Sequence, residues 1–184
     1  MRISVEGIEP APQGSKKHVG HGRMIEVSKR VKPWRKAVHL EALAQRAPLI
    51  EGACDIAVVF RFSRPKAHLN KRGKLKPQAP TFVTVKRNDI DKLLRSTLDA
   101  LTGSAILDDS QVVTVAAEKR YCFEGEPVGA EIIIKSLESV SGDRSATSLK
   151  DRPAFRLSTF LERYQAPRHQ QFINKQKKSP FSRG

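Results

Sequence analysis

Cysteine is almost absent from this chain of 184 residues, which contains only Cys54 and Cys122. Their spacing matches neither a zinc motif nor a disulfide framework, so we expect buried or incidental thiols in a reducing compartment. Aromatic residues make up only 6%, which argues against a groove that holds single strands by stacking bases on aromatic rings. No apolar run is long enough to cross a bilayer, and the N-terminus lacks the apolar segment of a signal peptide.

Acidic residues are also scarce. Lys and Arg number 34 against 19 Asp and Glu, which gives a formal net charge of +15. Such an excess indicates a polyanionic partner, most simply nucleic acid, although a ribosomal or membrane surface would select the same charge. The length suits one domain with an appendage, and a hydrophobic fraction of 39% is enough for a small core.

The few acids gather in one stretch. Its first half, residues 88–103, reads NDIDKLLRSTLDALTG, and its second, residues 106–113, reads ILDDSQVV. We term Asp89 and Asp91 the first acidic pair, and Asp108 and Asp109 the second. Five apolar residues of the first half follow the helical period, which predicts a helix packed on a core: Ile90, Leu93, Leu94, Leu98 and Leu101. We expect the two acidic pairs to meet where this helix begins and the following strand starts.

Each of these acids has an ordinary structural interpretation. Asp89 would cap the helix, Asp91 would pair with Arg95 four residues on, and the second acidic pair would form a turn. Four carboxylates in a chain of net charge +15 also suit a hard cation such as Mg²⁺ or Mn²⁺, which takes a few carboxylates and keeps several waters. Placing a metal ion against a phosphodiester requires a local cluster of carboxylates within a protein whose net charge is positive.

The motif resembles that of the RusA-type Holliday-junction resolvases, which runs Asp-x-Asp-Asn-x-x-Lys-x-x-x-Asp-x-Leu and later Asp-Asp-x-Gln-Val. The residues in register are Asp89, Asp91, Asp99, Leu101, Asp108, Asp109, Gln111 and Val112. The resemblance implies a homodimeric, Mg²⁺-dependent endonuclease, in which Mn²⁺ could substitute, that nicks four-way DNA junctions symmetrically in recombination and repair. It further implies an enzyme of the bacterial cytoplasm, encoded by a bacterium, a phage or a prophage.

The resemblance also assigns residues. The implied catalytic residues are Asp89, Asp91, Asp109 and Arg95, and the implied metal ligands are Asp89, Asp91, Asp108 and Asp109. Lys92 stands where the family often has asparagine, and Arg95 stands where it has a functional lysine. Arg95 keeps the charge but cannot lose a proton, so its expected role is electrostatic. The DNA-binding candidates are Lys16, Lys17, Arg35, Lys71, Arg72, Lys74, Lys86, Arg87 and Lys92.

The periodicities predict an α/β domain over residues 1–136, with a small mixed sheet, two main helices and the order β-α-β-(β)-α-β-β. The predicted strands cover residues 1–8, 54–62, 82–85, 111–121 and 129–136, and the predicted helices cover 28–46 and 90–101. A turn at 124–127 predicts a hairpin between the last two strands. Cationic loops are expected over 10–18 and over 63–80, the latter mobile above the substrate. Residues 137–184 are predicted to be a basic, mostly disordered extension with a short helix over 153–164.

Two rival functions follow from the same residues. The first is a basic, non-catalytic DNA-binding protein whose acids only cap and pair, which leaves four aligned acids without a role. The second is a nuclease for flaps or single strands, which would need more aromatic residues for stacking. Preference for a four-way junction rests on the resemblance and on symmetry, since a two-fold dimer could present two sites to a two-fold junction.

Overall fold

The computed structural model describes residues 1–137, apart from residues 15, 19, 21–23, 27 and 87. These residues belong to the first of two compact units, Met1–Gly142. The strands are β1 Arg2–Glu6, β2 Lys16–His18, β3 Met24–Glu26, β4 Cys54–Phe62, β5 Val112–Tyr121 and β6 Gly129–Ser136. The helices are α1 Val31–Ala44 and α2 Ile90–Leu101, with short 3-10 helices η1 Lys66–His68 and η2 Asp109–Gln111. The predicted extension and its helix lie outside the described residues.

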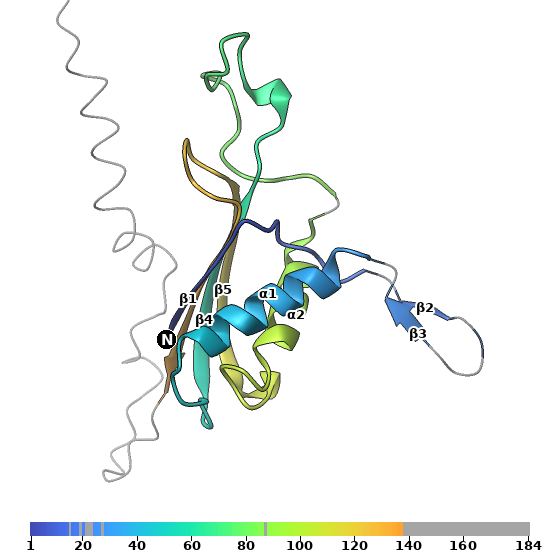
Figure 1. Cartoon of the computed structure of the whole chain (residues 1–184), viewed down its shortest axis with the longest axis vertical. Coiled ribbons are helices and arrows are strands. Elements are labelled where there is room, and N and C mark those ends of the chain that lie inside the picture. Colours follow the sequence, from blue (N-terminus) through green and yellow to red (C-terminus); the bar gives the residue numbers. More distant parts are fainter. Residues whose placement is uncertain (15, 19, 21–23, 27, 87, 138–184) are drawn as a thin grey trace, which may run out of the picture. The chain divides into compact units, whose positions relative to one another are not determined.

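Four strands form one mixed sheet in the order β1-β6-β4-β5 (Figure 1). β4 pairs in parallel with β5 and antiparallel with β6, which in turn pairs antiparallel with β1. The predicted α/β class with a mixed sheet is therefore confirmed. The predicted hairpin between the last two strands is wrong, because β4 lies between β5 and β6. Their connection passes the end of β4, where the Cys122 N–H donates to the Phe62 carbonyl oxygen at 2.8 Å.

β6 takes an interior position in the sheet, between β1 and β4, and one of its faces is strongly apolar. Ala130, Ile132 and Ile134 are buried on that face. At the start of the strand, a side chain on Gly129 would place its Cβ 1.8 Å from the carbonyl oxygen of Val5. The pairing of β6 with β1 therefore requires glycine at this position.

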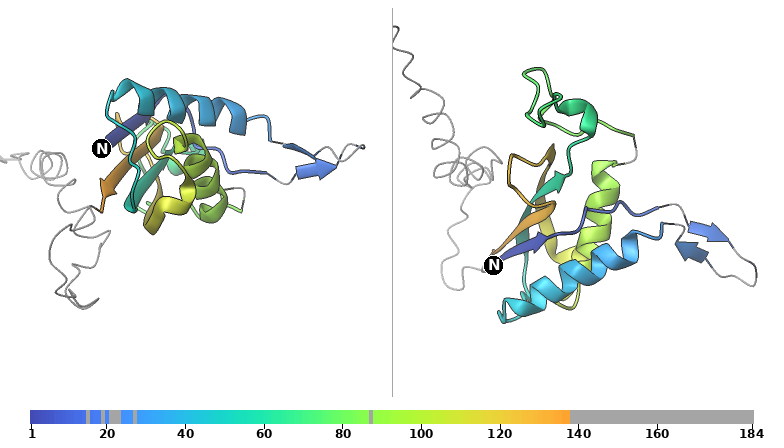
Figure 2. Two further views of the ribbon diagram at one scale, coloured as in Figure 1. Left: turned by 90° about the horizontal axis from the view of Figure 1, so that it is seen from below. Right: turned by 45° about the horizontal axis from the view of Figure 1, so that its top comes forward.

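α1 and α2 lie over the same face of the sheet (Figure 2). Their inner faces and alternate strand positions form the core, whose largest fully buried side chains include Trp34, Phe60, Ile3, Ile56, Leu93, Leu101 and Ile132. The two cysteines, Cys54 and Cys122, are buried and free, as expected. Within the described part of the chain, neither helix has the length and apolar character needed to span a membrane.

The inner face of α2 differs in part from the predicted apolar stripe. Leu93 is fully buried, but Ile90 is 37% exposed. Ser96 and Thr97 fill the inner face instead, and both are fully buried. Each hydroxyl donates to the Leu93 carbonyl oxygen, and the Thr97 Oγ1 also accepts the indole N–H of Trp34 at 3.2 Å. Polar residues can occupy a buried helix face when their hydrogen bonds are satisfied in this way.

Two further predictions of local structure are corrected. Residues 82–85 do not form a strand: Phe82 makes an isolated bridge to Arg120 in β5, and no further ladder follows in the described residues. The region predicted as a cationic loop over 10–18 contains β2, which pairs antiparallel with β3. Strands of three residues are too short to show a periodicity in the sequence.

The sheet face opposite the helices carries a layer of ion pairs. Arg120 donates two guanidinium hydrogen bonds to Glu126 at 2.5 and 2.7 Å. Arg61 lies 3.7 Å from the same carboxylate, and Glu118 lies 3.9 Å from Arg120. Burial would raise the pKa of Glu126, but the hydrogen bonds from Arg120 and from the Phe123 N–H hold it below its ordinary value. Glu126 is therefore ionised and neutralises two largely buried arginines.

We expect Glu126→Gln to lower the free energy of unfolding at neutral pH by about 2–4 kcal/mol, because Arg61 and Arg120 lose their shared anion in a poorly solvated place. The folded-state pKa of Glu126 is lowered, so its contribution is complete above the unfolded pKa and is lost as pH falls through the folded value. The difference between wild type and variant in urea unfolding should thus shrink as the pH falls below the ordinary range of a glutamate carboxyl group.

The matched control for this prediction is Glu124→Gln, an exposed position in the same connection. It should unfold like the wild type. A gap between wild type and Glu126→Gln that stays constant as the pH falls would contradict the assigned role of the carboxylate.

Candidate active site

The first acidic pair lies at the start of α2. Asp89 occupies the N-cap position, but its side chain accepts no capping hydrogen bond. Its Oδ2 instead accepts a hydrogen bond from Lys92 Nζ at 2.7 Å. This bond and the charge of Lys92 hold the pKa of Asp89 below its ordinary value, and they raise the pKa of Lys92. The capping interpretation of Asp89 is therefore wrong, and its ionised carboxylate, 42% exposed, remains accessible to a ligand.

Asp91 and Arg95 are both exposed on α2. Among the described residues no ion pair joins them, so the surface pairing that their spacing predicts is not formed. Asp91 acts through its charge on Lys92, whose pKa it helps to raise. The first two turns of α2 thus present two carboxylates and two cations to solvent.

The second acidic pair lies at η2, just before β5. Asp108 Oδ1 accepts the Ser110 N–H at 2.9 Å, and Gln111 Oε1 accepts the Asp108 N–H at 2.9 Å. These reciprocal bonds form a capping box, and those from Ser110 lower the pKa of Asp108. The Gln111 amide also donates to two carbonyl oxygens in the 50–52 segment. Asp109 is exposed. Gln111 is therefore the residue that fixes the turn presenting this pair.

The two acidic pairs lie at opposite ends of α2. Lys119, near the end of β5, donates to the Asn88 carbonyl oxygen at 2.6 Å, which places the first pair beside that end of the strand. The second pair precedes Val112, the first residue of β5. At ~3.3 Å per strand residue, the two pairs are separated by roughly 20 Å. Among the described residues, no three His, Cys, Asp or Glu side chains are grouped to hold a metal ion. The structure therefore does not bring the pairs together within one chain, contrary to our expectation.

The predicted basic loop, residues 63–80, extends from the end of β4 (Figure 1), and we term it the basic finger. At its tip, Asn70 Oδ1 accepts the N–H groups of Arg72 and Lys74 at 2.9 and 3.0 Å. The resulting turn exposes three candidate DNA contacts, Lys71, Arg72 and Lys74. A side chain bonded to its own backbone turn thus shapes the cationic tip.

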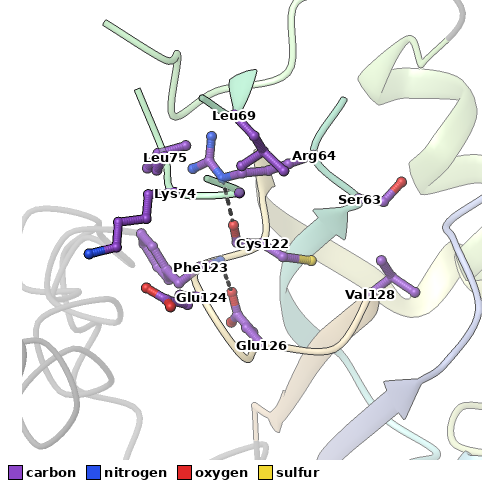
Figure 3. Close-up of a pocket in the computed structure, with 11 residues that line it drawn as sticks. Ser63, Arg64, Leu69, Lys74, Leu75, Cys122, Phe123, Glu124, Glu126 and Val128 are labelled. Atoms are coloured by element: carbon purple, nitrogen blue, oxygen red, sulfur yellow. Dashed lines mark hydrogen bonds between the residues drawn. The ribbon is translucent and has the colours of Figure 1, made fainter. Parts of the chain in front are cut away.

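The base of the basic finger is joined to the connection between β5 and β6. Arg64 donates to the carbonyl oxygen of Cys122 (Figure 3) and to that of Pro80, both at 2.9 Å. A pocket lies between the finger and this connection. Cationic, acidic and apolar side chains line it together, among them Lys74 and Glu124. Because acids offset the cations there, the pocket offers no concentrated positive charge for phosphate. Arg64 serves to anchor the finger.

The other DNA-binding candidates have varied surroundings. Arg35 of α1 forms an ion pair with Asp99 of α2, so this motif acid links the two helices. Lys86 is exposed in the segment that leads to α2. The backbones of Lys16 and Lys17 lie in β2, whereas their side chains and Arg87 lie outside the described residues.

Sequence reasoning missed Lys119. Its Nζ bonds the residue that precedes Asp89, and its charge helps to lower the pKa of Asp89, after the larger effects of Lys92. The available signal was a lysine within the apolar alternation of β5. The lysine can be recognised as part of the site only once the strand register is known. The register places Lys119 beside the buried Phe60 on the helix side of the sheet.

Comparison with known families gives one match. Residues 7–135 match the family model described as Endodeoxyribonuclease RusA, a span that contains both acidic pairs and the basic finger. A comparison with curated proteins found no match. The family match confirms the resemblance seen in the motif, and it identifies the chemistry as hydrolysis of DNA at internal positions. By this match, which extends over most of its length, the chain belongs to the RusA endodeoxyribonuclease family.

Proposed function

We propose that this protein is a Mg²⁺-dependent endonuclease that resolves four-way DNA junctions by paired symmetric nicks, in recombination and repair in the bacterial cytoplasm. The observation that carries the proposal is the exposed first acidic pair, in which Asp89 sits at the N-cap without capping the helix. In a protein of net charge +15, outward carboxylates beside the DNA weaken binding, so a catalytic role explains them best. Family membership supplies the reaction class.

The first acidic pair fits a hard divalent cation. Mg²⁺ in enzymes is commonly held by one or two carboxylates, with water and substrate phosphate in the remaining positions. Asp89 is ionised and its side chain is partly exposed, and Asp91 is exposed beside it on the same helix end. These two residues would hold the ion. When bound, Mg²⁺ or Mn²⁺ supplies Lewis-acid polarisation of the scissile phosphate and a lower pKa for a coordinated water.

The neighbouring cations act on the DNA. Arg95 has an exposed guanidinium on α2, and we assign it to the negative charge that develops on the phosphate during cleavage. Lys92 donates a hydrogen bond to the Asp89 carboxylate before substrate arrives, and it is placed to contact a neighbouring phosphate. The tip of the basic finger would contact the backbone further along the DNA, where such contacts set register and orientation.

A two-fold dimer would complete each site, since one chain leaves its acidic pairs roughly 20 Å apart. β5 is an edge strand of the sheet. Residues 81–83 pair with its last residues only, and from Val113 to Ala117 its outer backbone groups have no partner among the described residues. Val113 is 56% exposed and Val115 is 40% exposed. A long apolar edge of this kind is a template for pairing with another strand.

The register of such a pairing supports a shared site. If two β5 strands pair antiparallel about an axis at Val115, the partner's Val113 falls opposite Ala117, and the partner's Gln111 lies level with Lys119, beyond the last paired residue. The partner's second acidic pair would then lie just past the paired strands, beside the segment that leads to the first acidic pair. Each site would combine acids from both protomers, and the two sites would share the two-fold symmetry of a four-way junction.

The test of this function uses purified protein with labelled four-way, three-way, flap and linear duplex DNA, each with and without Mg²⁺. We expect paired nicks at symmetric positions of the four-way junction, only when Mg²⁺ is present. Preferential cutting of flaps or single strands would favour the flap nuclease instead. Binding without Mg²⁺-dependent cleavage of any substrate would overturn the nuclease proposal and favour a DNA-binding protein.

Arg95→Ala should slow cleavage by about 10²–10³-fold, the usual scale for one contact to transition-state charge. Arg95→Lys should keep much of the activity, because the positive charge remains and only the paired hydrogen bonds of the planar guanidinium are lost. Single-turnover rates on a four-way junction at saturating protein measure both effects. Lys36→Ala, which removes an exposed cation from α1, is the control and should cleave at the wild-type rate.

Two outcomes would contradict the electrostatic role of Arg95. An alanine variant as fast as the wild type would reduce it to a surface residue of α2. A new ionisation in the pH–rate profile of the lysine variant would show that this position takes part in proton transfer.

A further inference from the structure

We propose that Lys119 is a positioning residue for the first acidic pair, because it holds both ends of the segment that delivers Asp89 to the site. This inference rests on the function proposed above. The Lys119 carbonyl oxygen accepts the Val83 N–H at 3.3 Å, at the start of the segment. Its Nζ donates to the Asn88 carbonyl oxygen at 2.6 Å, at the end of the segment. Asn88 directly precedes Asp89, the N-cap of α2.

The register of β5 gives Lys119 this reach. Lys119 lies beside Phe60 of β4, which is fully buried on the helix side of the sheet. Its neighbours Glu118 and Arg120 belong to the ionic layer on the opposite face. A lysine in such a place keeps its aliphatic stem against the core and extends its ammonium group to the rim. That rim is where α2 begins.

The described residues of the segment between the two contacts have little other support. Val83 is buried, but Thr84, Val85 and Lys86 are exposed. The Asn88 N–H closes a turn on the Val85 carbonyl oxygen at 3.2 Å. The Asn88 side-chain oxygen is buried without a hydrogen-bond partner among the described residues. The ammonium of Lys119 is therefore the group that fixes the end of the segment against the sheet.

Loss of this ammonium should disturb catalysis more than DNA binding. Lys119→Met keeps the apolar stem and removes the charge and the donor. We expect the single-turnover cleavage rate on a four-way junction, at saturating protein, to fall about 10²-fold, the scale for a misplacement of about 1 Å. The junction Kd without Mg²⁺ should change less than about threefold, because Lys119 bonds the protein backbone and releases no counterion from DNA.

Rescue and local structure separate positioning from general stability. Lys119→Arg can still donate to the Asn88 carbonyl oxygen and should recover at least about tenfold of the lost rate. Amide hydrogen exchange, followed by mass spectrometry on the free protein, should accelerate over residues 83–91 in Lys119→Met. Lys135→Met, which removes an exposed lysine from β6, is the control and should change neither the rate nor the exchange.

Wild-type cleavage by Lys119→Met would overturn the proposal. An equal loss of cleavage and of junction affinity would also overturn it, because it would make Lys119 a DNA contact. Unchanged hydrogen exchange over residues 83–91 would show that the segment is held by other groups. If the wild type itself does not cleave, the proposed function fails, whereas the exchange comparison still decides whether Lys119 holds the segment.

Discussion

Asp91→Asn should bind a four-way junction as tightly as the wild type, or more tightly, and leave it uncut. The asparagine removes one of the two carboxylates that would hold Mg²⁺ at the start of α2, and we expect cleavage to fall by at least about 10³-fold. It also removes a negative charge from the DNA-binding surface, which favours association with phosphate. Gel-shift binding without Mg²⁺ and single-turnover cleavage with Mg²⁺ measure the two effects on the same preparation.

The control for Asp91→Asn is Glu41→Gln, which makes the same charge change at an exposed position of α1. Its cleavage rate should equal that of the wild type. Cleavage by Asp91→Asn at the wild-type rate would contradict the assignment of the first acidic pair as metal ligands. Loss of junction binding together with cleavage would show that Asp91 shapes the DNA surface and does not act in the chemistry.

A mixture of two inactive proteins, Asp91→Asn and Asp109→Asn, should regain cleavage. If each site combines the first acidic pair of one protomer with the second pair of the other, a mixed dimer concentrates both defects in one site. The other site is then entirely wild type. Statistical mixing makes half of the dimers mixed, so about a quarter of the sites should be active. Because each active dimer has one working site, the product should be singly nicked junctions.

A second mixture provides the matched control. Asp89→Asn and Asp91→Asn both alter the first acidic pair, so a mixed dimer carries a defect in each of its sites and should stay inactive. The proteins are unfolded and refolded together, or coexpressed, so that subunits exchange. If the Asp91→Asn and Asp109→Asn mixture stays inactive while mixed dimers are demonstrated, the site lies within one chain and the shared site is wrong.

The sequence was informative where one residue pattern sufficed. Alternation and apolar content placed the strand over 54–62 and the strand over 129–136 at the bounds that the structure shows. The order of the strands in the sheet could not be predicted in this way. A turn at 124–127 has the same residue pattern whether it joins two adjacent strands or carries the chain past the end of β4. Nothing local to the turn encodes that β6 pairs with β1 and β4.

The candidate site, too, could be predicted from the sequence only in part. The motif located the acids, and composition located the basic finger. Side-chain partners were less predictable: Asp89 has the residue type and position of a helix cap, yet it bonds Lys92. Ser96 and Thr97 interrupt the apolar stripe of α2 because hydrogen bonds, which hydrophobic periodicity does not register, satisfy them in the core. The distance between the acidic pairs depends on the direction of α2 along β5, which sequence spacing does not contain.

If the unpaired half of β5 joins two chains, as proposed above, activity would depend on how many copies of the protein a cell contains. A monomer would then carry one half of each of two sites, and the population of complete sites would rise with the square of the monomer concentration while monomers predominate. In a cell with few copies, most chains would then be inactive monomers. Catalysis would begin as expression passes the dimer Kd, so the specific activity per chain should fall on dilution.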